Sequence, residues 1–316
     1  EVARLLRGCR PRAFLFENVA GLVTLDGGTR SRRRRGEAPS FTVGRTFAAI
    51  LAEFEACGYE VSWRVVNSRH WLPQFRERVY MVGFRRGGGR AGGSKRAETP
   101  DQTPRGMDWD LPGVDSRAWS SDCAVTLRQV LELPDSPAVD WSELPPNHWA
   151  KVQRRMAEAE TEAAKAGATA AAAKEEGGAE EAAQVVEDGA GFPARLQRQE
   201  LPLDSKAPTL IAGYYRAGNF TAKYVFEERD GTRRDGRAGR RRPRFLTPRE
   251  CARVMGFAEA FEIPGLDGAK GRGDRYKQIG NAVCPPVIAA IGERIVQLLE
   301  GGGMSSGCAP PAKTKG

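Results

Sequence analysis

The stretch Phe14-Leu15-Phe16-Glu17-Asn18-Val19 decides the fold, together with a second stretch about sixty residues later, Gln74-Phe75-Arg76-Glu77-Arg78-Val79-Tyr80-Met81-Val82-Gly83. Each stretch sets polar side chains directly against an apolar run with strand character. In an open α/β sheet, ligands bind at the ends of strands. A carboxylate and two guanidinium groups brought together there can grip a planar ring, because guanidinium presents a rigid fork of donors. The two stretches therefore predict a site for a hydrogen-bonding ring such as a nucleobase.

Hydrophobic spacing around these stretches predicts alternating strands and helices. Ala13–Phe16 has the pattern of a buried strand with Glu17 at its C-terminal end, and strands are also expected over Tyr59–Asn67 and Val79–Phe84. Thr42–Cys57 has helical period, and Gly58 is expected to end that helix. Further helices are expected over Glu1–Arg7 with a stop at Gly8, after the capping box Thr247-Pro248-Arg249-Glu250, and over Pro286–Leu299.

Composition narrows the class of partner. The formal net charge is +9, with 49 Lys and Arg, and the basic residues are clumped, which favours a polyanion such as nucleic acid. The chain has 6 Cys without a CxxC pair and only 2 His, so we expect no zinc or other metal site. Scattered cysteines indicate a reducing compartment. We find no apolar run long enough to cross a bilayer, so no membrane partner is expected.

Four segments, in the same order, resemble those of the DNA cytosine-5 methyltransferase family. The first two carry its ENV motif at Glu17-Asn18-Val19 and its QxRxR motif at Gln74–Arg78. Leu246–Phe257 is similar to the family's LTxREaaRlqgF segment, and Tyr276–Val287 to its YKQIGNAVPPPV segment, with Cys284 in place of the usual Pro. The resemblance covers roughly residues 10–86 and 245–299. It implies an α/β fold: a partial Rossmann-like methyltransferase domain with an inserted α+β target-recognition region.

The family's reaction gives the predicted catalytic residues their roles. A cysteine thiolate adds to C6 of cytosine, C5 takes a methyl group from the sulfonium of S-adenosylmethionine, and a base removes the C5 proton. The addition pushes negative charge toward N3 and O2, where a proton donor and a fixed cation stabilise it. The resemblance implies that Glu17 contacts N3 and the exocyclic amine of cytosine, and that Arg78 contacts O2. It also places Asn18 and Arg76 in the catalytic group, with Arg76 positioning the catalytic loop or a phosphate.

The resemblance also implies binding contacts and a protonation state. Asn281, Ala282 and Val283 would line the pocket for S-adenosylmethionine, while Gln74 and Arg249 would contact the substrate. The expected partner is duplex DNA with the target cytosine flipped out of the stack. To donate a proton to N3, Glu17 must hold one, so we expect burial to raise its pKa.

We expect the chain to be divided into several parts. Residues 1–100 would be the C-terminal half of the catalytic domain, 101–245 the target-recognition region with a low-complexity insert at 156–190, 246–300 a return to the catalytic domain, and 301–316 a mobile tail. The family's FxGxG-like turn and its Pro-Cys-Gln nucleophile segment do not occur in the chain, and Cys284 lacks the nucleophile's context. We therefore expect an enzyme fragment that is inactive alone, with the missing N-terminal half as a candidate partner.

Alternatives remain open at the level of sequence. An RNA cytosine-5 methyltransferase of the same fold would share the motifs, and a DNA-binding remnant without catalysis would also fit the chain. The basic runs Arg30–Arg35 and Arg237–Arg244 fit either phosphate contacts or nuclear import. The localisation would be the nucleus in a eukaryote and the cytoplasm otherwise. Neither the recognised DNA sequence nor a maintenance or de novo role can be assigned from the residues.

Overall fold

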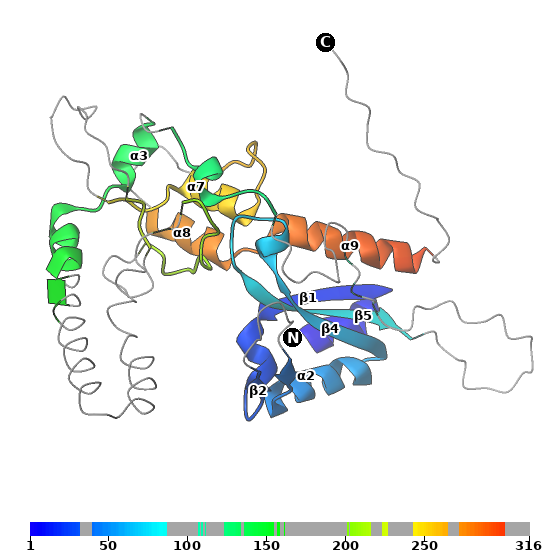
Figure 1. The fold of residues 1–316 in the computed structure, drawn as a ribbon. Helices are drawn as coiled ribbons and strands as arrows, with labels where there is room; N and C mark the ends of the chain where they lie inside the picture. Colours follow the sequence, from blue (N-terminus) through cyan, green and yellow to red (C-terminus); the bar gives the residue numbers. More distant parts are fainter. Residues whose placement is uncertain are drawn as a thin grey trace, which may run out of the picture. The chain divides into compact units, whose positions relative to one another are not determined.

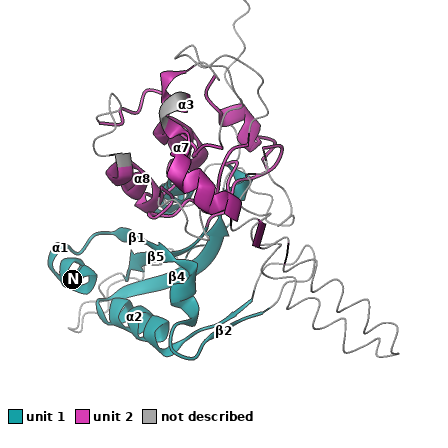
Figure 2. Ribbon diagram, turned by 90° about the vertical axis from the view of Figure 1, so that its left-hand side faces the viewer, with its two compact units in different colours: residues 1–71, 77–122, 286–316 teal, residues 72–76, 123–285 magenta. Residues whose placement is uncertain are grey.

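The computed structural model describes residues 1–31, 40–86, 107, 109, 111, 123–133, 136–154, 157–158, 161, 201, 203–215, 223–226, 243–264 and 272–300. These residues belong to two compact units, shown in teal and magenta in Figure 2. Unit 1 comprises residues 1–71, 77–122 and 286–316, and unit 2 comprises residues 72–76 and 123–285. The domain boundaries expected from sequence stay a prediction, and the low-complexity insert and the tail lie almost wholly outside the described residues.

Unit 1 is built on a three-stranded sheet. Strands β1 (Ala13–Val19), β5 (Glu77–Arg85) and β4 (Tyr59–Asn67) lie in the order β1-β5-β4, and β5 is antiparallel to both neighbours. The limits predicted for β4 are confirmed, whereas β1 is three residues longer than expected. The ladder of β1 with β5 continues to Val19, which pairs with Arg78, so Glu17 lies inside the strand rather than at its end.

Helix α2 (Arg45–Ala56) covers one face of this sheet (Figure 1). Phe47 and Phe54 of α2 are buried in one apolar cluster with sheet residues, and the Phe47 ring meets the edge of Trp63 with 5.1 Å between centroids. The helix ends where the sequence predicts, at Gly58, whose φ of 89° is a left-handed conformation that glycine adopts without strain. Burial of this aromatic face is what holds α2 on the strands.

Helix α1 (Val2–Cys9) precedes the sheet and buries Leu6 against it. The stop expected at Gly8 is wrong, because the helix continues to Cys9. Arg10 ends it instead, in a left-handed conformation with φ 45°, and its N–H donates to the Leu6 carbonyl over 3.1 Å. A hydrogen bond back to the last turn is the usual partner of such a C-terminal cap, and it stabilises a conformation that is otherwise unfavourable for arginine.

Residues 20–44 connect β1 to α2. They contain the 3-10 helix η1 (Ala20–Thr24) and a small hairpin of β2 (Thr29–Arg30) and β3 (Phe41–Thr42). The Gly44 N–H donates to the Val23 carbonyl over 2.8 Å. A Cβ atom at Gly44 would stand 1.9 Å from the Leu25 carbonyl oxygen, so the backbones of η1 and of the α2 start approach closer than any side chain allows.

We expect Gly44→Ala to destabilise unit 1 by about 1–3 kcal/mol, because the added methyl group overlaps backbone that must then shift. The φ of Gly44 is −81°, which alanine adopts freely, so the loss would be steric and not conformational. Urea unfolding of Gly44→Ala and Gly21→Ala makes a matched comparison, since nothing lies within 4 Å of a Cβ at Gly21. Equal midpoints for the two variants would contradict the close approach.

The described part of unit 2 combines short helices with irregular segments. Its helices include η3 (Leu127–Val130), α3 (Pro137–Ser142), α7 (Pro248–Met255) and α8 (Arg272–Asn281), and residues 146–154 are also helical. The predicted capping box of α7 is confirmed: Glu250 N–H donates to Thr247 Oγ1 over 3.1 Å, and Thr247 N–H donates to Glu250 Oε2 over 2.8 Å. Gly256, with φ 85°, ends the helix.

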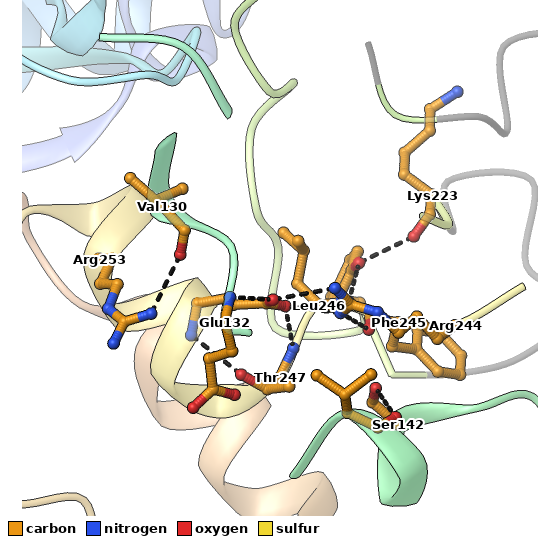
Figure 3. Close-up of polar contacts among 12 residues, drawn as sticks. Val130, Glu132, Ser142, Lys223, Arg244, Phe245, Leu246, Thr247 and Arg253 are labelled. Atoms are coloured by element: carbon orange, nitrogen blue, oxygen red, sulfur yellow. Dashed lines mark hydrogen bonds and ion pairs between the residues drawn. The ribbon is translucent and has the colours of Figure 1, made fainter. Parts of the chain in front are cut away.

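A buried ion pair lies at the start of α7. Arg244 Nη1 is 2.8 Å from Glu250 Oε2, and its Nη2 donates to Oε1 over 3.0 Å. The two side chains are 4% and 0% exposed. Glu250 Oε1 also accepts from the Glu132 N–H, and Figure 3 shows Glu132, Arg244 and Thr247 converging there. One carboxylate therefore joins three segments of unit 2.

Helix α9 (Pro285–Leu299) begins one residue earlier than predicted. From Pro286 it belongs to unit 1, where the Arg12 guanidinium donates to the Leu299 carbonyl over 2.9 Å. By length and composition alone, Gly273–Leu299 is apolar enough to cross a membrane. The chain is not helical at 282–284, however, and α9 has 15 residues, fewer than the roughly 20 that span a bilayer. Its buried Val287, Ala290 and Ile291 favour packing on protein.

Candidate functional site

Glu17 and Arg78 meet on neighbouring strands of unit 1. Glu17 pairs with Tyr80 and Val19 with Arg78, so the two charged residues are diagonal neighbours on one face of the β1–β5 ladder. Arg78 Nε lies 3.1 Å from Glu17 Oε1, and the side chains are 15% and 22% exposed. Arg78 Nη1 also donates to the Glu77 carbonyl over 2.7 Å. The convergence of carboxylate and guanidinium expected from the two motifs is present in this structure.

Asn18 does not join this pair. It follows Glu17 in the strand and is opposite Val79, so its side chain is directed to the other face of the ladder. There its Oδ1 accepts a hydrogen bond from the Val19 N–H over 2.8 Å. This hydrogen bond is local and lies at the end of the strand. The catalytic assignment of Asn18 stays a prediction.

Gln74, from the same motif as Arg78, belongs to unit 2. The segment Pro73–Phe75 pairs with Ala207 through two backbone hydrogen bonds of 2.8 Å, and Thr209 Oγ1 donates to the Phe75 carbonyl over 2.6 Å. Gln74 is fully buried beside this pairing. The motif is therefore divided: its first residues build unit 2, and β5 of unit 1 begins at Glu77.

Arg76 is buried in unit 2, with 3% of its surface exposed. Its guanidinium donates to three backbone carbonyls: Leu210 over 2.8 Å, Gly280 over 3.1 Å and Ala282 over 2.8 Å. A planar fork of donors suits such a convergent set of acceptors better than a lysine would. Arg76 thus fixes the turn that follows α8, while Arg78 faces Glu17 in the other unit.

The turn after α8 carries the residues predicted to line a cofactor pocket. Asn281 and Val283 are exposed and Ala282 is partly buried, whereas Cys284 is buried. A Cβ at Gly280 would come within 2.6 Å of the Ile211 carbonyl, so the turn is in close backbone contact with 211–212. The turn is held from two sides and presents a polar amide and an apolar side chain outward. Such a turn fits a ligand with both polar and apolar parts.

Arg249, predicted to contact substrate, is the second residue of α7. Its Nε lies 4.0 Å from Glu259 Oε1, and Arg253 of the same helix makes a closer ion pair with Glu259 at 2.7 Å. The single Glu259 carboxylate is therefore shared by two arginines and lies closer to Arg253. The contacts of Arg249 describe a helix-surface ion pair, and a role for it in substrate binding stays a prediction.

The sequence interpretation missed the partner of Glu250. The sequence predicts a basic loop over Arg237–Arg244, and no pattern in it marks Arg244 as a buried residue. Among the described residues, no group of three His, Cys, Asp or Glu side chains could hold a metal ion. Burial raises the pKa of the Cys251 thiol well above its ordinary value, which disfavours the thiolate that a nucleophile needs.

The fold is shared with a methyltransferase of known structure. The crystal structure of the S. pombe Dnmt2 methyltransferase superposes with a TM-score of 0.50 at 16% identity, over 93% of this chain and 68% of that one. The predicted α/β class is confirmed. The family model for C-5 cytosine-specific DNA methylase matches residues 1–297, so the chain belongs to that family.

Curated relatives agree with the family. Type II methyltransferase M1.ScrFI of Lactococcus lactis subsp. cremoris is 29% identical over 95% of this chain and 55% of its own length. Type II methyltransferase M.NlaX of Neisseria lactamica is 28% identical over 93% of this chain and 66% of its own. The chain thus spans between about half and two thirds of the length of these relatives. Both relatives come from bacteria, and the localisation, the nucleus in a eukaryote and the cytoplasm otherwise, stays a prediction.

Proposed function

We propose that the protein containing this chain methylates C5 of cytosine in duplex DNA, with S-adenosylmethionine as methyl donor. The observation that carries the proposal is the Glu17–Arg78 pair, 3.1 Å apart on adjacent strands in a chain of the C-5 cytosine-specific DNA methylase family. The pair offers a carboxyl group and a guanidinium on one face of a sheet. Those are the groups needed at N3 and at O2 of a pyrimidine ring.

Binding of the base would replace the ion pair between Glu17 and Arg78 by contacts of both side chains with the ring. In the ion pair, Glu17 is a carboxylate neutralised by Arg78. When a cytosine is inserted, Arg78 would turn to its O2, and Glu17, in a partly buried place, would take up a proton from solvent and donate it to N3. Both changes stabilise the negative charge that develops in the ring when a nucleophile adds to C6.

The turn after α8 would form one wall of the cofactor site. Asn281 would offer its amide to polar groups of S-adenosylmethionine, and Val283 an apolar surface, with Ala282 between them. When bound, S-adenosylmethionine supplies the methyl group from its sulfonium. The contribution of this chain is to hold that wall in place through Arg76, whose three hydrogen bonds fix the turn.

We expect Glu17→Gln in the full-length protein to lower kcat for duplex DNA about 10²–10³-fold. Glutamine keeps the size and the hydrogen bonding but cannot deliver a proton. Transfer of a labelled methyl group to DNA measures the effect. Glu55→Gln, an exposed carboxylate on α2, is the matched control and should be unchanged. Equal activity of both variants would contradict the role of Glu17.

The same assay separates the alternatives. Labelling of duplex DNA but not of transfer RNA supports the proposal, and the reverse result indicates an RNA methyltransferase of this fold. DNA binding without methyl transfer by the intact protein indicates a non-catalytic remnant. We further propose that residues 1–316 alone are inactive, because no Pro-Cys-Gln segment occurs in them. Turnover by the purified chain would contradict that.

A further inference from the structure

The hairpin of β2 and β3 is fixed at its base beside η1. Thr29 pairs with Thr42 and Arg30 with Phe41. The ladder gains one more step because the Ser31 N–H donates to the Ser40 carbonyl over 3.0 Å and the two hydroxyl groups lie 2.8 Å apart. A Cβ at Gly28 would stand 2.4 Å from the Thr42 carbonyl oxygen, so the hairpin lies tightly against its neighbouring turn. Arg30 therefore projects from a well-anchored base.

Arg30 reaches the strand that carries the base-binding arginine. Its Nη2 lies 2.8 Å from Glu77 Oε2, and its guanidinium is 5.5 Å from the centroid of the Phe41 ring. Glu77 is the first residue of β5 and directly precedes Arg78, which donates to the Glu77 carbonyl. Because Glu77 and Arg78 are consecutive in β5, the Arg30–Glu77 pair and the Arg78–Glu17 pair lie on opposite faces of the sheet, both at the start of this strand.

The two pairs differ in exposure and hence in strength. The side chain of Arg30 is 43% exposed and that of Glu77 20%, compared with 15% and 22% in the Arg78–Glu17 pair. An ion pair with one solvated partner contributes only about 0–1 kcal/mol, so a phosphate can compete with Glu77 for Arg30. Guanidinium has five N–H donors in a fork that also suits phosphate, and one carboxylate does not occupy all of them.

We propose that Arg30 contacts a backbone phosphate next to the flipped nucleotide, and that Glu77 holds Arg30 in place until the nucleic acid displaces it. The inference rests on the proposed function, because it needs a base between Glu17 and Arg78. Phosphates follow one another at about 3.4 Å of helix axis per strand, so a nucleotide bound there brings its phosphates close to the start of β5. Stacking over Phe41 keeps the guanidinium extended in the absence of DNA.

The test compares two matched ion pairs. Arg30→Ala removes the proposed contact and Glu77→Gln removes its competitor. Arg7→Ala and Glu53→Gln change a second exposed pair, on α1 and α2, whose side chains are 54% and 50% exposed. Each variant of the intact protein is titrated against a fluorescein-labelled duplex oligonucleotide over a series of NaCl concentrations. Thermal unfolding of each variant shows whether its fold is retained.

We expect Arg30→Ala to weaken binding and to reduce the slope of log K against log[NaCl] by about 0.9, the value for one phosphate contact. Glu77→Gln frees Arg30 and should tighten binding, while the Arg7 and Glu53 variants keep the wild-type slope.

Three outcomes would overturn this. If wild-type binding depends on salt and Arg30→Ala has the same slope of log K against log[NaCl], the inference is overturned and the proposed function still stands. Weaker binding by Glu77→Gln, equal to that of Arg30→Ala, would show that the pair only holds the hairpin. Wild-type protein that does not bind duplex DNA would remove the proposed function and this inference together.

Discussion

Replacing Glu250 with alanine is expected to lower the free energy of unfolding by about 3–5 kcal/mol, the largest stability effect that we predict. The carboxylate is fully buried, forms a two-point ion pair with Arg244, caps the α7 start at Thr247 and accepts the Glu132 N–H. Alanine would remove the carboxylate that binds the buried Arg244 guanidinium at two points, and breaking a buried ion pair from one side is strongly destabilising. Equilibrium urea unfolding measures the loss.

A second ion pair, between Arg253 of α7 and Glu259 beyond the end of this helix, provides the control. Glu259 binds Arg253 at 2.7 Å, but its side chain is 65% exposed, so Glu259→Ala should cost no more than about 1 kcal/mol. The double variant Arg244→Met with Glu250→Leu removes both buried charges and should be less destabilised than Glu250→Ala alone. If Glu250→Ala and Glu259→Ala unfold at the same urea concentration, the buried pair is not the stabilising centre of unit 2.

Much of unit 1 could be predicted because its determinants are local. The alternation over Tyr59–Asn67 and the glycine at 58 mark elements whose limits need only neighbouring residues. The meeting of Glu17 with Arg78 follows from two motifs that share a ladder. The greater length of β1 was missed, because pairing as far as Val19 depends on β5, a partner far along the chain.

Contacts made through backbone carbonyls could not be predicted. Arg76 binds Leu210 and Gly280, 134 and 204 residues further on, and a carbonyl acceptor leaves no trace in the identity of its residue. Burial could not be predicted either. Arg244 is the last residue in a run of basic residues and its side chain is buried, whereas the side chain of Arg30 is 43% exposed. Arginines of identical appearance in sequence thus differ in burial and partners, and their proposed roles follow from those surroundings.

We expect Arg76→Met to lower the free energy of unfolding by about 2–4 kcal/mol and to loosen the turn after α8. Three carbonyls would lose a charged donor, at about 1–3 kcal/mol for each buried group left unsatisfied, and such costs do not add fully. Because the chain from Gly280 to Val283 carries the residues proposed for the cofactor wall, its loosening should weaken binding of S-adenosylmethionine more than binding of DNA. Amide hydrogen exchange in peptides covering 276–285 and 207–212 measures the turn directly.

The matched variant is Arg78→Met, two residues along the same motif. Arg78 makes a partly exposed ion pair with Glu17 in unit 1, whereas the turn in unit 2 is bound by Arg76, so the loss of Arg78 should leave exchange at 276–285 unchanged while lowering methyl transfer to DNA. Arg76→Lys should fall between wild type and Arg76→Met, because an ammonium group cannot match the fork that joins Leu210, Gly280 and Ala282. Faster exchange at 276–285 in Arg78→Met would contradict these separate roles of the two arginines. Unchanged exchange at 276–285 in Arg76→Met would contradict them as well. The exchange measurement needs no cofactor and no DNA, so its result stands even if the proposed activity fails.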